Sequence, residues 1–301
     1  MQPLTAQRKA TLVKQASRIS VVTAVVLFMV KLSVWLLSGS VSILATLMDS
    51  LLDAFASAVT LIAVSIATKP ADSDHHFGHG KAEQLAALAQ SAFITGSGLF
   101  LILHAIDSIR ADEPIEHSQL ALIVMGFSMA LTVLLLVYQN YVIRMTGSMA
   151  IKSDAMHYRV DLLANVGVVV ALIVAPAGFP LADPLIGIAI AVYIIVSTGQ
   201  LAWQAIQMLM DRSMDEESEN VIRELALSNN AVFGIHNLRT RMSGVTPVIQ
   251  FDLDLDGTLS LEQAHTIGNQ VKHRILEQMP GADITIHLDP IRDSLPLCKK
   301  N

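Results

Sequence analysis

Six long apolar segments dominate this 301-residue chain and restrict what it can fold into. Each is long enough to cross the hydrocarbon core of a bilayer, which takes about 20 helical residues. Because lipid offers the backbone no hydrogen-bond partners, a spanning segment has to be a helix or part of a closed barrel. The sequence therefore predicts six transmembrane helices, at 17–38, 41–68, 82–108, 118–143, 149–176 and 183–208.

The composition supports a membrane protein with a soluble tail. The chain is 52% hydrophobic and only 15% charged, whereas a soluble domain carries about 25% charged residues. Most of the charge lies in the first twenty residues, in short connectors and after Asp211. The net charge of −6 gives no support to nucleic-acid binding. The single cysteine, Cys298, excludes an internal disulfide.

The basic residues of the connectors predict the orientation of the chain, because cytoplasmic loops are enriched in Lys and Arg. Lys and Arg occur in the N-terminal arm, in the loop at 69–81 and in the connection at 144–152. The turns at 38–40 and 175–180 carry none. We therefore expect a multi-pass protein of the cytoplasmic (inner) membrane with both termini in the cytoplasm. The first apolar run has no small-residue cleavage site, so we expect it to be retained.

The chain after Asp211 has the pattern of a small soluble domain. An amphipathic helix rich in acids is followed by two alternating segments, "VFGIHNLRTRM" and "TPVIQFDLDLD", which read as strands. "SLEQAHTIGNQVKHRILEQM" begins with a capping pattern and continues with helical periodicity, and "ADITIHLDP" closes as a strand. The order αββαβ predicts a two-layer, metallochaperone-like α+β domain. We expect a transmembrane domain over 1–210 and a cytoplasmic metal-binding domain over 211–301.

Two pairs of ionisable residues lie deep in apolar segments, where charge is costly. Asp49 and Asp53 are spaced i, i+4 in the second segment, and His157 and Asp161 have the same spacing in the fifth. Each pair therefore projects from one helix face, and both come within a few residues of the bilayer midplane. Two helices can thus present three carboxylates and an imidazole to one point.

The alternative interpretation is that these acids only pair with basic residues. Lys31 and Arg159 are the candidates, but two bases do not neutralise three acids. Three oxygen ligands and one nitrogen ligand at matched depth suit a divalent metal such as zinc. The residues therefore favour a metal site.

A histidine-rich loop, "KPADSDHHFGHGK", joins the second and third segments. Its composition is compatible with a metal site and equally with a polar, solvated loop.

The segment "FGHGKAE" in this loop occurs together with D-x-x-x-D, H-x-x-x-D, six spans and the αββαβ tail. In this combination the chain resembles the cation diffusion facilitator family, and within it the bacterial zinc- and iron-efflux branch. The resemblance implies a homodimeric secondary transporter, not an enzyme, that exchanges a cytoplasmic divalent cation for protons. It places the transport site at Asp49, Asp53, His157 and Asp161. A histidine in the set implies zinc or cadmium, and ferrous iron and manganese remain open.

The resemblance implies two further metal sites. Asp72, His75 and His79 match a loop site. The tail matches a binuclear zinc site, and its ligand positions fall on His236, Asp252, His265, His287 and Asp289. Asp252 stands where the family has a histidine, and its alternation with apolar neighbours is equally that of a solvated strand face. Whether this site holds one or two ions is therefore left open, as is its role in regulation or in stability.

Three other functions are alternatives to metal–proton antiport. A passive metal channel would place weaker sites along a pore, and a membrane-bound sensor would need only the tail sites. An intramembrane metal-dependent hydrolase would need an open coordination position and a base such as that of HExxH, which the sequence lacks. There is also no Walker motif to support ATP hydrolysis.

Overall fold

The computed structural model describes residues 4–39, 41–110, 119–174 and 182–291. The chain divides into two compact units, Ala10–Leu209 and Met210–Asn301, the second of which also includes Met1–Lys9. The predicted turn at 175–180 and Cys298 lie outside the described residues.

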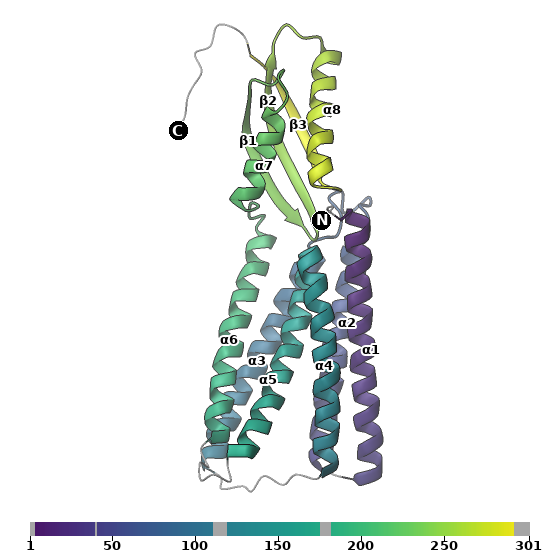
Figure 1. Cartoon of the computed structure of the whole chain (residues 1–301), viewed down its shortest axis with the longest axis vertical. Helices are drawn as coiled ribbons and strands as arrows, with labels where there is room; N and C mark the ends of the chain where they lie inside the picture. Colours follow the sequence, from purple (N-terminus) through teal and green to yellow (C-terminus); the bar gives the residue numbers. More distant parts are fainter. Residues whose placement is uncertain (1–3, 40, 111–118, 175–181, 292–301) are drawn as a thin grey trace. The chain divides into compact units, whose positions relative to one another are not determined.

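The first unit consists of helices that run side by side along their lengths (Figure 1). They are α1 (Ala6–Ser38), α2 (Val41–Ala67), α3 (Ala82–Arg110), α4 (Gln119–Thr146), α5 (Met149–Val174) and α6 (Ala182–Leu209). α5 packs against α2, α3, α4 and α6, and α3 packs along α6. The helix that carries His157 and Asp161 is therefore surrounded by other helices.

Five of these helices are long and apolar enough to cross a membrane, judged over the described residues. The apolar stretches are Gln7–Ser38, Thr46–Ala67, Ala82–Leu103, Leu122–Thr146 and Leu185–Leu209. α5 differs because it carries Lys152, Asp154, Arg159 and Asp161. Ionisable groups in membrane helices generally face the bundle interior, and the helices around α5 provide that interior. The predicted helical membrane domain is confirmed.

Two glycines end helices of this unit. Gly39 after α1 has φ 63° and Gly147 after α4 has φ 70°. Their N–H groups donate to the carbonyls of Trp35 and Ile143, each at 2.8 Å. Such left-handed residues close a helix and turn the chain sharply, which side chains with a Cβ resist. The short α4–α5 connection therefore makes these two helices antiparallel neighbours.

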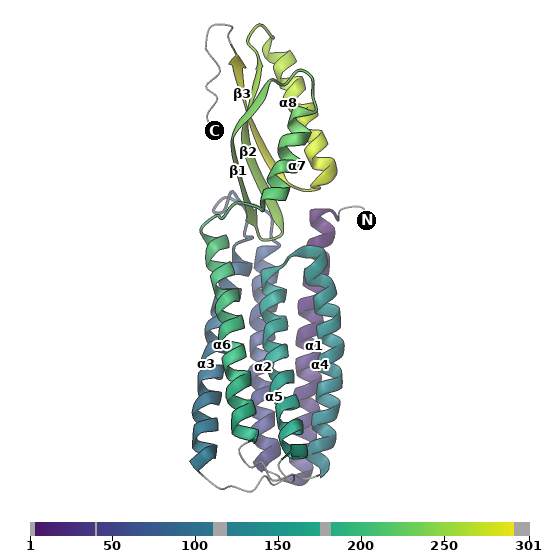
Figure 2. The same ribbon diagram turned by 60° about the vertical axis from the view of Figure 1, so that its left-hand side comes forward.

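The second unit has the predicted order αββαβ, so the expected α+β fold is confirmed. Its elements are α7 (Glu216–Leu227), β1 (Gly234–Ser243), β2 (Thr246–Asp256), α8 (Leu261–Gln278) and β3 (Asp283–Ile291). The sheet order is β1-β2-β3, with β1 antiparallel and β3 parallel to β2. Both helices cover one face of the sheet (Figure 2).

Strand alternation separates the two faces of this sheet. Ile249, Phe251 and Leu253 of β2 are buried and pack with Ile222 of α7 and Val271 of α8. The intervening residues of β2 point to the opposite face, because successive strand side chains alternate. The face left open by the helices therefore carries the polar side chains of β2 and β3.

Candidate metal centres

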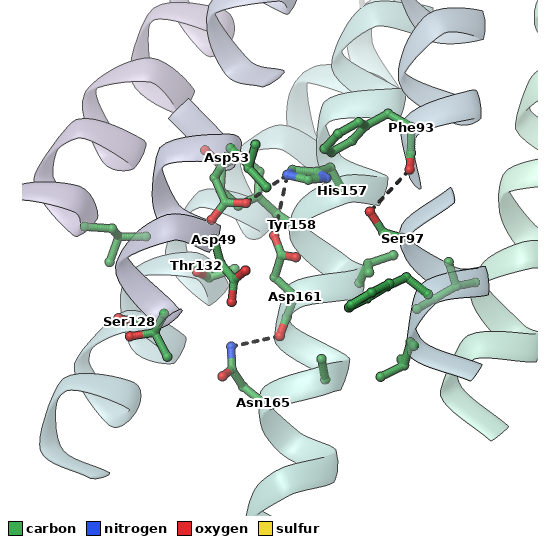
Figure 3. A pocket seen from close by; sticks show the side chains of 18 of the residues that line it. Asp49, Asp53, Phe93, Ser97, Ser128, Thr132, His157, Tyr158, Asp161 and Asn165 are labelled. Carbon is green, nitrogen blue, oxygen red and sulfur yellow. Dashed lines mark hydrogen bonds and ion pairs between the residues drawn. The ribbon is translucent and has the colours of Figure 1, made fainter. Parts of the chain in front are cut away.

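A cavity of about 350 Å³ lies among the helices of the first unit and is lined by Asp49, Asp53, His157 and Asp161. Figure 3 shows these side chains converging from α2 and α5. His157 Nε2 lies 3.0 Å from Asp53 Oδ1 and 3.8 Å from Asp161 Oδ2. One ligand atom from each of Asp53, His157 and Asp161 lies within 4.8 Å of the others. The structure thus brings these three predicted residues together, and Asp49 borders the same cavity.

Protein largely shields two of the four candidate ligand side chains, whereas that of Asp161 is 33% exposed and Asp49 is exposed. The side chains of Asp53 and His157 are only 14% and 9% exposed. Asp161 Oδ2 is buried and has no hydrogen-bond partner among the described residues. A buried carboxylate oxygen without a donor is costly, and a cation beside it would remove that cost. The residues therefore fit a divalent ion.

The two basic residues that could have neutralised these acids have other partners. Lys31 Nζ donates to Ser50 Oγ at 2.7 Å and to the Thr46 carbonyl at 3.1 Å. The Arg159 guanidinium donates to the Asn140 side-chain oxygen. Within the described part of the chain, no ion pair joins either base to a carboxylate. Simple acid–base pairing therefore does not account for the acids of the pocket.

Asp154, one turn before His157 on α5, was not singled out from the sequence. It is completely buried. Its carboxylate accepts hydrogen bonds from Gln139 Nε2 at 2.7 Å, Ser57 Oγ at 3.2 Å and Thr60 Oγ1 at 3.4 Å. The Tyr158 hydroxyl lies 2.9 Å from Ser57 Oγ. This network joins α2, α4 and α5 next to the cavity. A second aspartate on α5, seven residues before Asp161, was the available signal.

The loop between α2 and α3 brings together Asp72, His75 and His79. Asp72 Oδ1 accepts the His75 backbone N–H at 2.8 Å, and Asp72 Oδ2 lies 3.3 Å from His79 Nε2. The backbone N–H of His75 is the main reason that the pKa of Asp72 lies below its usual value. His79 Nδ1 is buried and has no hydrogen-bond partner among the described residues. The nitrogen that faces the Asp72 carboxylate is Nε2, so Nε2 is the His79 atom placed to share a metal with Asp72.

On the open face of the sheet, one imidazole lies among carboxylates. His236 Nε2 is 3.1 Å from Asp289 Oδ2 and 3.6 Å from Asp252 Oδ2. His236 Nδ1 is 3.3 Å from Asp254 Oδ1, and His287 Nε2 is 3.0 Å from Asp289 Oδ1. A ligand atom from each of His236, Asp254 and Asp289 falls within 4.8 Å of the others. A mixed imidazole and carboxylate set fits a divalent metal.

Strand register and a missing side chain explain why Asp254 joins this group. Asp254 pairs with Gly234 on β1 and with Asp289 on β3. A Cβ built at Gly234 would lie closer to Asp254 Oδ2 than van der Waals contact allows, so the Asp254 carboxylate can take its present position because residue 234 has no side chain. The register shift between His236 and Arg239, where Asn237 has φ 51°, bends β1 at this point. Sequence alternation alone could not distinguish Asp254 from a solvated aspartate.

His265 lies elsewhere in the same unit. It is exposed on α8 and lines a depression with Ile284, Ile286 and Leu288 of β3. These residues alternate with His287 and Asp289 along the strand, so they face the helix side of the sheet. The described contacts on the open face involve His236, His287 and three aspartates and do not include His265.

The fold and these clusters define a helical membrane protein with an attached α+β domain and three groups of potential metal ligands. Residues 17–210 match the model of the cation efflux transmembrane domain, and residues 214–291 match the cytoplasmic domain of cation efflux proteins. The chain therefore belongs to the cation efflux family of metal transporters, which confirms the resemblance drawn from its motifs.

Relatives match along nearly the whole length. The cation-efflux pump FieF of Shewanella oneidensis is 42% identical over 280 residues, which cover 93% of this chain and 95% of that protein. FieF of Serratia proteamaculans is 42% identical over 281 residues, 93% of this chain and 94% of that protein. The metal-bound C-terminal domain of the CzcD transporter from Thermotoga maritima is 23% identical, with a TM-score of 0.25. It covers 27% of this chain and all of that domain, a likeness too weak to support any inference.

Proposed function

We propose that this chain exports a divalent cation, zinc above cadmium or ferrous iron, from the cytoplasm in exchange for protons. The observation that carries the proposal is the meeting of Asp53, His157 and Asp161 donor atoms within 4.8 Å in a cavity among the helices. Asp49 borders the same cavity and completes the set. The curated relatives are named as cation-efflux pumps, which agrees with transport out of the cytoplasm.

Competition between metal and protons supplies the coupling. A metal binds only deprotonated ligands, so binding releases protons and protonation releases the metal. Imidazole suits this exchange because its reference pKa of about 6.5 lies close to cytoplasmic pH. The two halves of the ligand set lie on α2 and α5, so a change in the packing of these helices would open or close the site. Alternating exposure to the two sides of the membrane would turn the competition into antiport.

The two peripheral clusters would hold resident or regulatory ions. In the loop, Asp72, His75 and His79 would bind a metal on the cytoplasmic side. In the tail, zinc would be held by His236, Asp252, His287 and Asp289, joined by Asp254, and it would stabilise one arrangement of a homodimer. A tail ion changes transport only if it binds two conformations with different affinity. The basic connectors support cytoplasmic termini in the inner membrane.

Zinc flux into proteoliposomes under an imposed pH gradient tests this proposal. An internal zinc-sensitive dye reports uptake, and an internal pH indicator reports counter-movement of protons. Asp53→Ala should abolish flux, because it removes the carboxylate 3.0 Å from His157. His236→Ala should lower flux only partially. Asp283→Ala, an exposed aspartate at the start of β3, serves as the matched control and should transport normally.

The same assay separates the alternatives. Zinc flux that ignores the pH gradient would indicate a passive channel, and zinc binding without flux would indicate a sensor. Normal transport by Asp53→Ala would disprove the assigned site.

A further inference from the structure

The cavity in the first unit contains a fixed positive charge that metal binding does not require. Lys31 of α1 lines the same cavity as the three aspartates. Its ammonium donates to Ser50 Oγ and to the Thr46 carbonyl of α2. Both acceptors are neutral, and Ser50 is buried with 1% of its surface exposed. The ammonium is therefore anchored beside the ligands by oxygens that carry no charge.

This anchoring separates Lys31 from an ordinary ion-pair partner. An ammonium bound directly to Asp53 or Asp161 would compete with an incoming metal for the carboxylate. Among the described residues, no carboxylate forms an ion pair with Lys31, so its charge can stay in place when an ion enters. An ammonium in this position adds to the electrostatic potential at the ligands without occupying a coordination position.

The formal charges of the cavity then have a definite balance. The described residues lining it include three carboxylates at −1 each, Asp49, Asp53 and Asp161, and one ammonium at +1, which together give −2. A divalent ion brings this total to zero when His157 binds as neutral imidazole. A trivalent ion would leave a net positive charge in this partly buried site, and uncompensated charge removed from water is costly.

We propose that Lys31 is a valence-determining residue of the transport site: its anchored ammonium sets the charge of the cavity at −2 and so favours divalent over trivalent cations. This inference rests on the proposed transport function of the same cavity. Without Lys31 the cavity would carry −3, which a trivalent ion neutralises. By Coulomb's law the ammonium repels a trivalent ion with one and a half times the energy with which it repels a divalent ion at the same position, so its removal favours the trivalent ion more.

Competition between zinc and Tb³⁺ in the flux assay tests this idea on the full-length protein. For each variant, the zinc concentration at half-maximal flux is measured first, and then the Tb³⁺ concentration that halves the flux. We expect Lys31→Gln to improve Tb³⁺ inhibition relative to zinc by about tenfold or more. Lys31→Arg keeps the charge and should retain the wild-type ratio. Lys14→Gln removes a positive charge from another position of α1 and should also retain it.

Each outcome decides the matter. If Lys31→Gln leaves the ratio of the half-inhibiting Tb³⁺ concentration to the half-saturating zinc concentration unchanged, the inference is overturned. It is also overturned if Lys31→Arg changes this ratio as much as Lys31→Gln does, because the shape of the side chain and not its charge would then be responsible. If Lys31→Gln does not fold, the wild-type protein provides the second test. Its half-inhibiting Tb³⁺ concentration should exceed its half-saturating zinc concentration by about tenfold or more, and Tb³⁺ inhibition at or below the zinc concentration overturns the inference.

Failure of this inference and failure of the proposed function are distinguishable. If Asp53→Ala transports zinc like the wild type, the cavity is not the transport site. If Asp53→Ala is inactive and Lys31→Gln keeps the wild-type ratio, only the role of Lys31 is wrong.

Discussion

The buried carboxylate of Asp154 allows a sharp test of what holds α5 in place. In Asp154→Ala, Ser57 Oγ keeps the Tyr158 hydroxyl and Thr60 Oγ1 keeps the Ala56 carbonyl as partners. Gln139 Nε2 keeps only Ser20 Oγ, so one of its N–H groups loses its acceptor. A buried unpaired donor costs about 1–3 kcal/mol, and the space left by the carboxyl group adds a cavity term. We therefore expect Asp154→Ala to lower the free energy of unfolding by about 3 kcal/mol.

Asp154→Asn is the matched control, because it keeps the shape of the side chain. Its amide oxygen can take the place of Asp154 Oδ2 and accept the hydrogen bond from Gln139 Nε2. Its amide nitrogen then faces the Ser57 and Thr60 hydroxyls, whose oxygens can accept. We therefore expect Asp154→Asn to cost less than about 1 kcal/mol.

Thermal unfolding of the purified protein in detergent measures the difference. For a unit of this size, 1 kcal/mol corresponds to about 2–4 °C in Tm, so Asp154→Ala should lower Tm by about 6–12 °C. Asp154→Asn should lower it by only a few degrees. Equal losses in the two variants would refute the reasoning, because only the asparagine keeps an acceptor for Gln139 Nε2. A Tm within about 2 °C of the wild type in Asp154→Ala would refute it as well.

Three further predictions concern helix packing, acid stability and metal binding. A Cβ at Gly167 would lie 2.7 Å from Ile190 Cδ1 of α6, so Gly167→Ala should lower Tm. Gly199→Ala is the control: a Cβ there would have nothing within 4 Å, so this variant should leave Tm unchanged or raise it. The Asp215 carboxylate caps α7 by accepting the Ser218 backbone N–H, which holds the pKa of Asp215 below its usual value. The cap therefore stabilises α7 fully at pH values above the pKa of Asp215 in the unfolded chain, about 3.9. This stabilisation is lost as the pH falls through the lower pKa of Asp215 in the folded protein. Hydrogen exchange of α7 amides should show this acid-dependent loss in the wild type but not in Asp215→Asn. Zinc at about 100 times its Kd should stabilise the tail by about 2.7 kcal/mol, a chelator should reverse the effect, and His236→Ala should reduce it in a denaturant titration.

The positions of the helices followed from the sequence because span length and turn residues leave little freedom. The largest difference is at α1, which begins at Ala6 and not at residue 17. The preceding arm, "AQRKATLVKQASR", is rich in strong helix formers, so the helix continues beyond the apolar run. Hydropathy identifies the residues that can lie in lipid. It does not identify the residue at which a helix ends in water.

The side chains around the site were harder to predict because they depend on how helices are rotated against one another. The i, i+4 pairs placed Asp53 and Asp161 on defined faces of their own helices, and the structure shows that those faces meet. The acceptors of Lys31 and the donors around Asp154 come from other helices. No spacing within one segment reveals them, and for Asp254 the decisive facts are the strand register and the missing side chain of Gly234.

The loop between α2 and α3 uses the two oxygens of Asp72 for different purposes. Oδ1 accepts the backbone N–H groups of Asp74 and His75, at 3.1 and 2.8 Å, and so holds the turn. Oδ2 faces His79. The same carboxylate therefore holds the turn and faces a histidine. If the loop binds a metal as proposed, the chain would already be ordered and would lose little conformational entropy on binding. Replacing Asp72 would then remove a proposed ligand and also loosen the turn that carries His75 and His79.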